Sequence, residues 1–513
     1  MESEPLTSSK IKIPPEDWAL TPLSVQQAFL QILHQVAALE EELNKLRIEV
    51  ERLREQTQRS SRNSSQPPSS DTPDKPPRRE RKSSGKKRGA QPGHEGHQRK
   101  LYPPEECRSV SDHRPTKCRD CGAALSGDDP NPLRHQVVEL PETPPLVDEH
   151  RLHQLICPDC GETTRGSLPQ DVPACGYGPR LAAAVGVLGG KYRQSDRQTQ
   201  EMLEDFFRVE VALGTINNLR QEVSESLSTP VAGATEFAQQ QEAANMDETG
   251  WRQGNSDGNN PTRRKAWLWV LVTSWVTVFQ VHLSRGQASA RDLLGEFAGY
   301  LITDRWTGYS WWPLERRQLC WAHLIREFQK IADRGGESKE VGEGLLTQAH
   351  KLFELWHRVR DGTLTREGFA AAVVEIRAAV QKWLEDGASY KVARGDKSVR
   401  AKTARTCQEL LKVEQALWLF VRVVGIEPTN NAAERALRPA VIWRRVSLGT
   451  QSALGSQFVA RMLTVTQTLR AQQRPVLEFL TEACQAARQG TPAPSLLPDL
   501  SVLEQEHHLA IAA

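Results

Sequence analysis

ANMDETGW, at residues 244–251, opens a series of segments that predict a β-sheet. Two runs rich in β-branched and aromatic residues follow it, AWLWVLVT at 266–273 and WVTVFQVHL at 275–283; such residues favour strands. A helix is expected over 288–297, before a short strand, LITD, at 301–304. Strands that are first adjacent and then alternate with helices predict a mixed α/β sheet covered by helices.

A second pattern interrupts the sheet along the chain. From Ile325 to Phe420 nearly every segment has helical periodicity, which predicts a large helical insertion. The chain then returns through GIEPTNN, residues 425–431, to a helix that contains Glu434.

The length and composition narrow the class of protein. A chain of 513 residues is too long for one hydrophobic core, so we expect several domains. The sequence has neither a long apolar run nor the pattern of a secretory signal, and we therefore expect a cytoplasmic protein that does not enter membranes. In that compartment nine cysteines favour metal binding over disulfides. The net charge of +2 says little about nucleic acid, so the distribution of charge matters more.

Residues 25–56 are predicted to form a coiled-coil zipper. Two sets of apolar residues recur every seven positions, Phe29, Val36, Leu43 and Val50 at a and Ile32, Leu39, Leu46 and Leu53 at d. Glutamates at g and arginines at e permit opposite charges to pair across a parallel dimer, so we expect a homodimer. The alternative is a single amphipathic helix packed on its own domain.

Residues 57–110 are predicted to form a basic, Ser- and Pro-rich flexible linker, because apolar side chains are too few to offset the entropy of ordering. We expect its cations to contact DNA phosphates without sequence preference. The alternative is a solvated tail. The cations concerned are Arg78, Arg79, Arg81, Lys82, Lys86, Lys87 and Arg88.

Two matching Cys-x2-Cys-Gly motifs predict a structural zinc site. Cys118 and Cys121 form the first pair, and Cys157 and Cys160 form the second. Two such pairs supply four thiolates to one tetrahedral ion and leave no position for a catalytic water. The long segment between them is more typical of a zinc ribbon than of a Cys2His2 finger. The alternative is four unrelated buried thiols.

The segment at residues 175–230 has the pattern of helices separated by a turn at Leu213 and Gly214, as in a helix-turn-helix. Asn217, Asn218 and Arg220 near the start of the last helix are then the side chains presented to DNA bases. An ordinary helical connector is the alternative.

Three acidic residues are candidates for holding catalytic metal ions. Asp247 and Asp304 each lie near the end of a predicted strand, and Glu434 lies on a helix that Asn430 or Asn431 is expected to cap. Two Mg²⁺ ions stabilise the attacking and leaving oxygens of a phosphodiester, and carboxylates are their preferred ligands. Two other acids, Glu248 and Glu427, are alternatives to a chosen one, and two cations one turn apart, Arg435 and Arg438, are candidates for phosphate contact.

Several motifs, in one order along nearly the whole chain, resemble those of the insertion sequence sixty-six family of transposases. They are the zipper, GAQPGHEG at 89–96, the two cysteine pairs, MDETGW at 246–251, Asp304 with Tyr309, CWAH at 320–323 and NNAAERALRP at 430–439. The resemblance implies an RNase H-like, retroviral integrase-like catalytic fold, with Asp247, Asp304 and Glu434 as a DDE triad. It departs at Trp306, where a smaller residue is expected. The role of Cys320 and His323 stays open, since two ligands fall short of a metal shell.

The predicted fold class is therefore multidomain α/β, with an RNase H-like mixed sheet that carries a large helical insertion. The expected divisions are the zipper at 25–56, the linker at 57–110, a zinc-binding domain at 111–170, a helix-turn-helix-like segment at 175–230, the first part of the catalytic core at 240–330, the insertion at 331–422, the last part of the core at 423–450 and a C-terminal helical segment at 451–500.

The predicted function is metal-dependent cleavage of DNA ends and strand transfer of an insertion sequence. The expected cofactors are Mg²⁺ or Mn²⁺ at the acids and Zn²⁺ at the cysteines. The expected partners are DNA, a second copy of the chain and accessory proteins of the same element. The alternatives are an RNase H-like metal-dependent nuclease without strand transfer and a zinc-containing DNA-binding regulator without catalysis.

Overall fold

The computed structural model describes residues 14–57, 59–60, 62–64, 99–169 and 172–498. The chain divides into two compact units. The larger unit comprises residues 1–75, 149–200 and 211–513, and the smaller comprises residues 76–148 and 201–210. The basic residues predicted between Arg78 and Arg88 lie outside the described residues.

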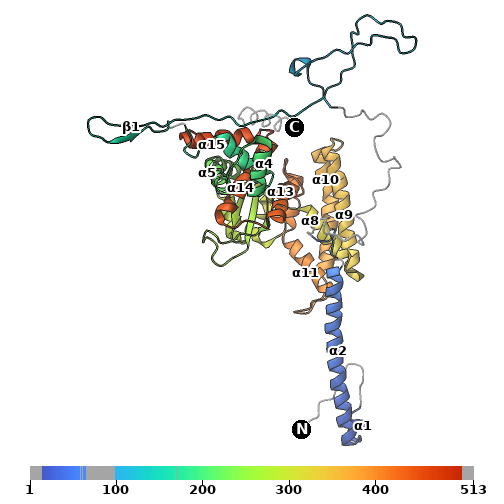
Figure 1. Ribbon diagram of the computed structural model, residues 1–513. Coiled ribbons are helices and arrows are strands. Elements are labelled where there is room, and N and C mark those ends of the chain that lie inside the picture. Colours follow the sequence, from blue (N-terminus) through green and yellow to red (C-terminus); the bar gives the residue numbers. More distant parts are fainter. Residues whose placement is uncertain (1–13, 58, 61, 65–98, 170–171, 499–513) are drawn as a thin grey trace. The chain divides into compact units, whose positions relative to one another are not determined.

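The larger unit contains a five-stranded sheet (Figure 1). The sheet is mixed, as the sequence predicts. Its order is β5-β4-β3-β6-β7. The strands β3, β4 and β5 are antiparallel neighbours, whereas β6 and β7 run parallel to β3. The strand bounds are β3 Ala243–Trp251, β4 Ala266–Val272, β5 Thr277–His282, β6 Tyr300–Thr303 and β7 Arg317–Leu319.

Helices cover this sheet and close its β5 edge. The helix α13 (Asn431–Ser447) packs on β3 and β4, and α14 (Ala453–Ala471) lies along β5. Two threonine hydroxyls of α14 accept hydrogen bonds from β5, Thr468 from the amide of Thr277 at 3.0 Å and Thr464 from the amide of Phe279 at 2.9 Å. Because these amides of the edge strand already have hydrogen-bond partners, they are not available to pair with a strand of another chain.

The helical insertion lies between β7 and α13. Its helices are α8 Trp321–Ala332, α9 Gly336–Arg360, α10 Arg366–Ala388, α11 Val399–Lys412 and α12 Leu419–Arg422. Figure 1 shows α8 to α11, in yellow and orange, gathered into a group of their own. They share a core of buried aromatic and aliphatic side chains that continues onto Ile302 and Leu319 of the sheet. The core therefore ties the insertion to the two strands on either side of the loop that holds Asp304.

The remaining helices of the larger unit come before, within and after the strands of the sheet along the chain. Near the N-terminus are α1 (Pro15–Ala19) and the long α2 (Leu23–Thr57). Before the sheet come α3 Pro179–Gly186, a π-helical turn at Val187–Lys191, α5 Leu213–Ser226 and α6 Ser228–Gln239; α4 (Asp196–Phe207) contains residues of both units. Between β5 and β6 lies α7 (Gln287–Leu294), and α15 (Val476–Gln489) packs on α3 and α5. Within the described residues no helix is long and apolar enough to cross a bilayer.

Apart from Phe29, whose ring packs against Trp18, the side chains of the heptad seam on α2 are exposed in the single chain. Leu39 is 63% exposed and Leu46 is 60% exposed, and Ile32, Val36, Leu43, Val50 and Leu53 are also exposed. A row of exposed apolar residues at heptad spacing is a surface that gains free energy by burial against a partner.

Candidate active site

The two aspartates are brought together by the parallel pairing of β3 with β6. Asn245 of β3 is the register partner of Ile302 of β6. Two residues further on, the same register places Asp247 level with Asp304, which directly follows β6. Successive strand residues alternate between faces, so residues two apart on both strands project to the same face.

Glu434 approaches the aspartates from the first turn of α13. The pKa of Asp247 is raised well above its usual range, first by burial and then by the negative charges of Glu248, Asp304 and Glu434. Asp304, from the loop after β6, and Glu434, from α13, are therefore both near enough for their charges to act on Asp247 of β3. A cluster of like charges in a poorly solvated place is costly for the protein alone and is relieved by a bound cation.

Asn430 fastens the start of α13 to β3, and this differs from the role expected for it. Asn430 is the N-cap residue, but its side chain makes no capping hydrogen bond. Its Nδ2 instead donates to the carbonyl of Met246 at 2.8 Å, and its Oδ1 accepts from Nδ2 of Asn245 at 2.9 Å. The residue is fully buried. Asn430 thus joins the helix that carries Glu434 to the residue directly before Asp247.

Glu248, the first alternative to the chosen acids, is already engaged. Its side chain is 1% exposed, and Arg285 lies 2.7 Å from one carboxylate oxygen. The hydroxyl of Tyr309 donates to the other oxygen. Burial raises the pKa of Glu248, while the bond from Tyr309 opposes that rise. Glu427, the second alternative, is exposed at the surface. Both carboxylate oxygens of Glu248 are therefore occupied by contacts within the protein.

Arg317 orders the loop that begins with Asp304. It is 3% exposed and donates to the hydroxyl of Thr303 and to the backbone carbonyls of Asp304 and Tyr309. Burial lowers the pKa of Arg317 to about 10, and the charge of Asp304 opposes that shift. The side chain of Asp304 also accepts from the amide of Trp306 at 2.9 Å. The orientation of Asp304 is therefore set by its own loop.

Glu434 also faces Cys320 and His323, the two residues whose role the sequence leaves open. One ligand atom from each of the three lies within 4.8 Å of the others. The Nδ1 atom of His323 is buried 3.6 Å from Glu434, and among the described residues it has no hydrogen-bond partner. The Sγ atom of Cys320, however, accepts a hydrogen bond from the amide of Asn430 at 3.1 Å. Cys320 therefore has a structural contact in addition to any ligating role.

The residues predicted to contact DNA fall into two groups within the described chain. Arg435 and Arg438 are exposed on α13, one turn apart and next to Glu434. Asn217, Asn218 and Arg220 lie on α5. Arg220 is held within the protein, since it lies 2.6 Å from Asp196 and stacks over the ring of Phe458. A DNA base at Arg220 therefore has to compete with these contacts.

Each cysteine pair forms a turn with the same hydrogen bonds. In the smaller unit the amide of Cys118 bonds to the carbonyl of Ala123, and the amide of Gly122 bonds back to Cys118. In the larger unit Cys157 bonds to Glu162 and Gly161 to Cys157, between β1 (Gln154–Ile156) and β2 (Thr163–Arg165). Both glycines have positive φ, 71° and 73°. Backbone amides of each turn lower the pKa of the first cysteine, which favours the thiolate that a metal needs.

Two supporting residues of this site were not predicted from the sequence, and a third was expected in a different role. Arg285 and Arg317 had no motif of their own, and Asn430 was expected to cap a helix. The one signal available was the position of Asn430 immediately before the helix of Glu434. Asn430 and Arg285 act on residues far away in the chain. Arg317 acts on residues 8 to 14 positions before it, a spacing that no helix or strand periodicity specifies.

Comparisons with known proteins relate the chain to mobile elements. The sequence is similar to the Transposase IS66 family over residues 177–457, a range that contains all three acids. Residues 13–100 match a family of unknown function (DUF6444). The chain is also 27% identical over 253 residues to a protein of Sinorhizobium fredii (strain NBRC 101917 / NGR234) named Uncharacterized protein y4qI. That match covers 45% of this chain and 45% of the relative.

Proposed function

Because the chain belongs to the IS66 transposase family, we propose that it cleaves DNA at the ends of an insertion sequence and joins the freed ends to target DNA. Asp247, Asp304 and Glu434 form the catalytic DDE triad. The single observation that supports this proposal is the approach of the three carboxylates: the pairing of β3 with β6 places Asp247 level with Asp304, and the charges of Asp304 and Glu434 both act on the pKa of Asp247.

The donor set fits hard divalent cations. Carboxylate oxygens are preferred by Mg²⁺ and Mn²⁺. When bound, two such ions stabilise charge on the attacking and leaving oxygens of an in-line displacement. In the first reaction water displaces the 3′ oxygen of one strand and leaves a 3′-OH. In the second that 3′-OH displaces a 3′ oxygen of the target strand, so no covalent protein–DNA intermediate is required.

The protein's own residues position the site. Asn430 holds the helix of Glu434 against β3, and Arg317 holds the loop of Asp304. Tyr309 and Arg285 keep Glu248 out of the metal shell by satisfying both its oxygens. Arg435 and Arg438 contact phosphates that flank the reacting bond.

We further propose an RNase H-like catalytic fold interrupted by the helical insertion. Support comes from three antiparallel strands followed by two strands parallel to the central β3, with one aspartate at each of the neighbouring strands β3 and β6. The domain divisions expected from the sequence are kept as part of this proposal.

The segments of the chain that precede the catalytic sheet hold DNA ends and a second copy of the chain. The exposed seam of α2 supports pairing of two protomers as a coiled coil, and two protomers hold two ends in one complex. The matched turns at Cys118 and Cys157 each supply two thiolates to zinc. The basic linker and the helices around α5 contribute contacts to DNA.

Strand transfer with end-containing DNA in Mg²⁺ tests the proposed function. We expect the parent chain to yield cleaved and joined products and Asp304→Ala to yield neither, with DNA binding retained. Asp386→Ala is the matched control, because it removes an exposed acid of α10. Cleavage without joining in the parent establishes the nuclease alternative. DNA binding without cleavage establishes the regulator alternative.

A further inference from the structure

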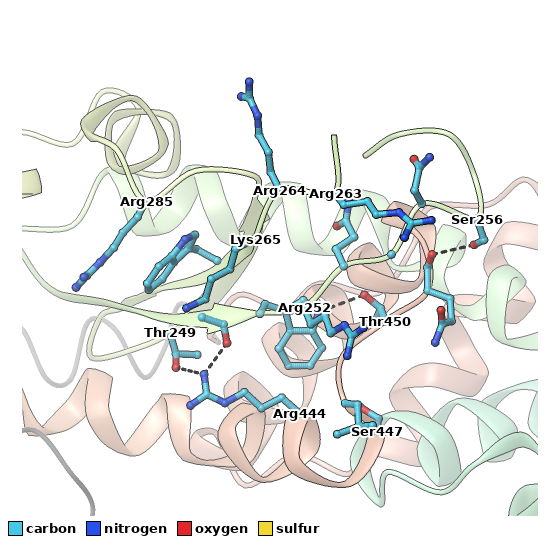
Figure 2. A pocket seen from close by; sticks show the side chains of 18 of the residues that line it. Thr249, Arg252, Ser256, Arg263, Arg264, Lys265, Arg285, Arg444, Ser447 and Thr450 are labelled. Carbon is cyan, nitrogen blue, oxygen red and sulfur yellow. Dashed lines mark hydrogen bonds between the residues drawn. The ribbon is translucent and has the colours of Figure 1, made fainter. Parts of the chain in front are cut away.

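A large basic cavity opens beside the candidate active site. Its volume is about 1460 Å³, and it begins at Glu248 and Thr249, the two residues that follow Asp247 on β3. Figure 2 shows its walls, which come from the end of β3, the loop from 252 to 265 and the C-terminal part of α13. The cavity therefore continues directly from the strand that carries the first predicted catalytic acid.

Positive charge dominates the wall. Among the described residues that line the cavity, six are cationic and one, Glu248, is acidic. Glu248 is already neutralised by Arg285 at 2.7 Å. The cations are Arg252, Arg263, Arg264, Lys265, Arg285 and Arg444. A concave surface with such an excess of one sign attracts a polyanion and raises its local concentration.

The loop from 252 to 265, which bears four of these cations, is held in one conformation by internal hydrogen bonds. Its centre is Asn260, which is fully buried. Nδ2 of Asn260 donates to the carbonyls of Gln253 and Arg264, and its Oδ1 accepts from the amide of Arg264. The loop is joined to the start of α14 as well, since Asp257 accepts from the amide of Ala453 at 2.7 Å. The cations are thus presented from a fixed backbone.

Most of the charged groups in the wall are cations, and several of its uncharged groups are engaged within the protein. Several polar side chains of the wall hold the wall itself: Asn255 accepts from the amide of Asn260, and Ser256 donates to the carbonyl of Gln451. The ring of Trp267 is covered by Lys265 at 4.5 Å and by Arg285 at 4.8 Å, so its face is not offered to a base. Phosphates are the part of DNA that such a surface recognises.

Figure 2 distinguishes cations that support the wall from cations that project from it. Arg444 turns toward Thr249 and donates to its hydroxyl at 2.7 Å. Arg264 extends away from the other labelled side chains. Arg252 and Arg263 are exposed, and Arg263 has a positive φ of 48°, a conformation that costs energy for a residue with a side chain.

We propose that this cavity binds the sugar-phosphate backbone of the DNA that leads away from the reacting phosphodiester, without reading its sequence. The inference rests on the proposed function, because the active site supplies the reason for DNA to be present there. Beyond the proposed function, the inference names the surface that binds DNA, the loop from 252 to 265, and the kind of contact, neutralisation of phosphates by its cations.

The test is the salt dependence of DNA binding by the full-length chain, measured by fluorescence anisotropy in Ca²⁺ with an end-containing duplex and an unrelated duplex. Each phosphate contact contributes about 0.9 to the slope of log K against log salt. We expect R252Q/R263Q to make that slope shallower by about 2 on both duplexes, because two phosphate contacts are lost. R358Q/R360Q, which removes two exposed cations of α9, is the matched control and keeps the parent slope.

An unchanged slope for R252Q/R263Q, or a loss confined to the end-containing duplex, overturns the proposal. Thermal unfolding of each variant checks that it is folded. If R252Q/R263Q does not fold, R264Q/K265Q on the same loop is measured in its place, with the same expected direction. The proposed function is tested separately by cleavage, because Asp304→Ala loses activity while keeping the full salt slope.

Discussion

Replacing Asn430 with alanine tests the claim that this buried side chain positions Glu434. The substitution removes two hydrogen bonds, one to the carbonyl of Met246 at 2.8 Å and one from Asn245 at 2.9 Å. Both connect the start of α13 to β3, and Asn430 is fully buried. A lost buried hydrogen bond costs about 1 kcal/mol, and more where the partner stays without a replacement. We therefore expect the free energy of unfolding to fall by about 2–4 kcal/mol for the two bonds.

Thermal and denaturant unfolding followed by tryptophan fluorescence measures the loss, because Trp251 and Trp269 are buried in this sheet. Asn431→Ala is the matched control: it changes the same residue type one position later, where the side chain is exposed. We expect Asn431→Ala to change stability by less than about 0.5 kcal/mol, as for an ordinary surface position.

A second readout separates positioning from stability alone. If Asn430 sets the place of Glu434, Asn430→Ala requires more Mg²⁺ for half-maximal DNA cleavage at a temperature where it is fully folded. Asn430→Asp keeps the acceptor for Asn245 but loses the donor and adds a negative charge near Asp247, so it does not restore the parent behaviour. Equal stability and equal Mg²⁺ dependence of Asn430→Ala and Asn431→Ala would refute the reasoning.

Three other predictions concern metal and pH. Mg²⁺ at about 100 times its dissociation constant is expected to stabilise the parent by about 2.7 kcal/mol and to have a smaller effect on Asp304→Asn, as seen in thermal unfolding with and without a chelator; an equal effect would place the ion elsewhere. Burial alone would raise the pKa of Asp257, but hydrogen bonds from Asn259, Ala453 and Leu454 outweigh it and lower that pKa. Asp257→Ala should therefore lower the free energy of unfolding by about 0.5–1 kcal/mol at neutral pH. This difference between parent and variant is present above the unfolded-state pKa of Asp257 and disappears as the pH falls through its lower folded-state pKa. A difference that stays constant when unfolding is measured at decreasing pH would contradict this. The amount of zinc bound per chain, measured by metal analysis, should be lower in Cys118→Ser than in the parent. It should be unchanged in Cys107→Ser, because Cys107 belongs to neither Cys-x2-Cys pair.

Patterns that depend on neighbours within a few residues were readable in the sequence. The β-branched and aromatic runs predicted the strands at 266–273 and 275–283, and the structure has β4 and β5 there. The mixed sheet was also predicted, because adjacent strands followed by alternating strands and helices leave few ways to bury their apolar faces. The family was recognisable from the order of its motifs and is the one that residues 177–457 match. The cysteine turns and the heptad seam are likewise local, although their metal and their partner remain proposals.

Contacts between distant segments were decided by packing. Asn430 meets Asn245 across 185 positions, and Arg444 meets Thr249 across 195. Glu248 looked equivalent to its neighbour Asp247 in sequence, and only the folded chain brings Tyr309 and Arg285 to its two carboxylate oxygens. The basic cavity is likewise absent from any single segment, since its cations come from the loop from 252 to 265, the segment between β5 and α7, and α13. No periodicity or spacing rule specifies which side chains meet when a sheet and its covering helices pack, because that outcome depends on the three-dimensional path of the whole unit.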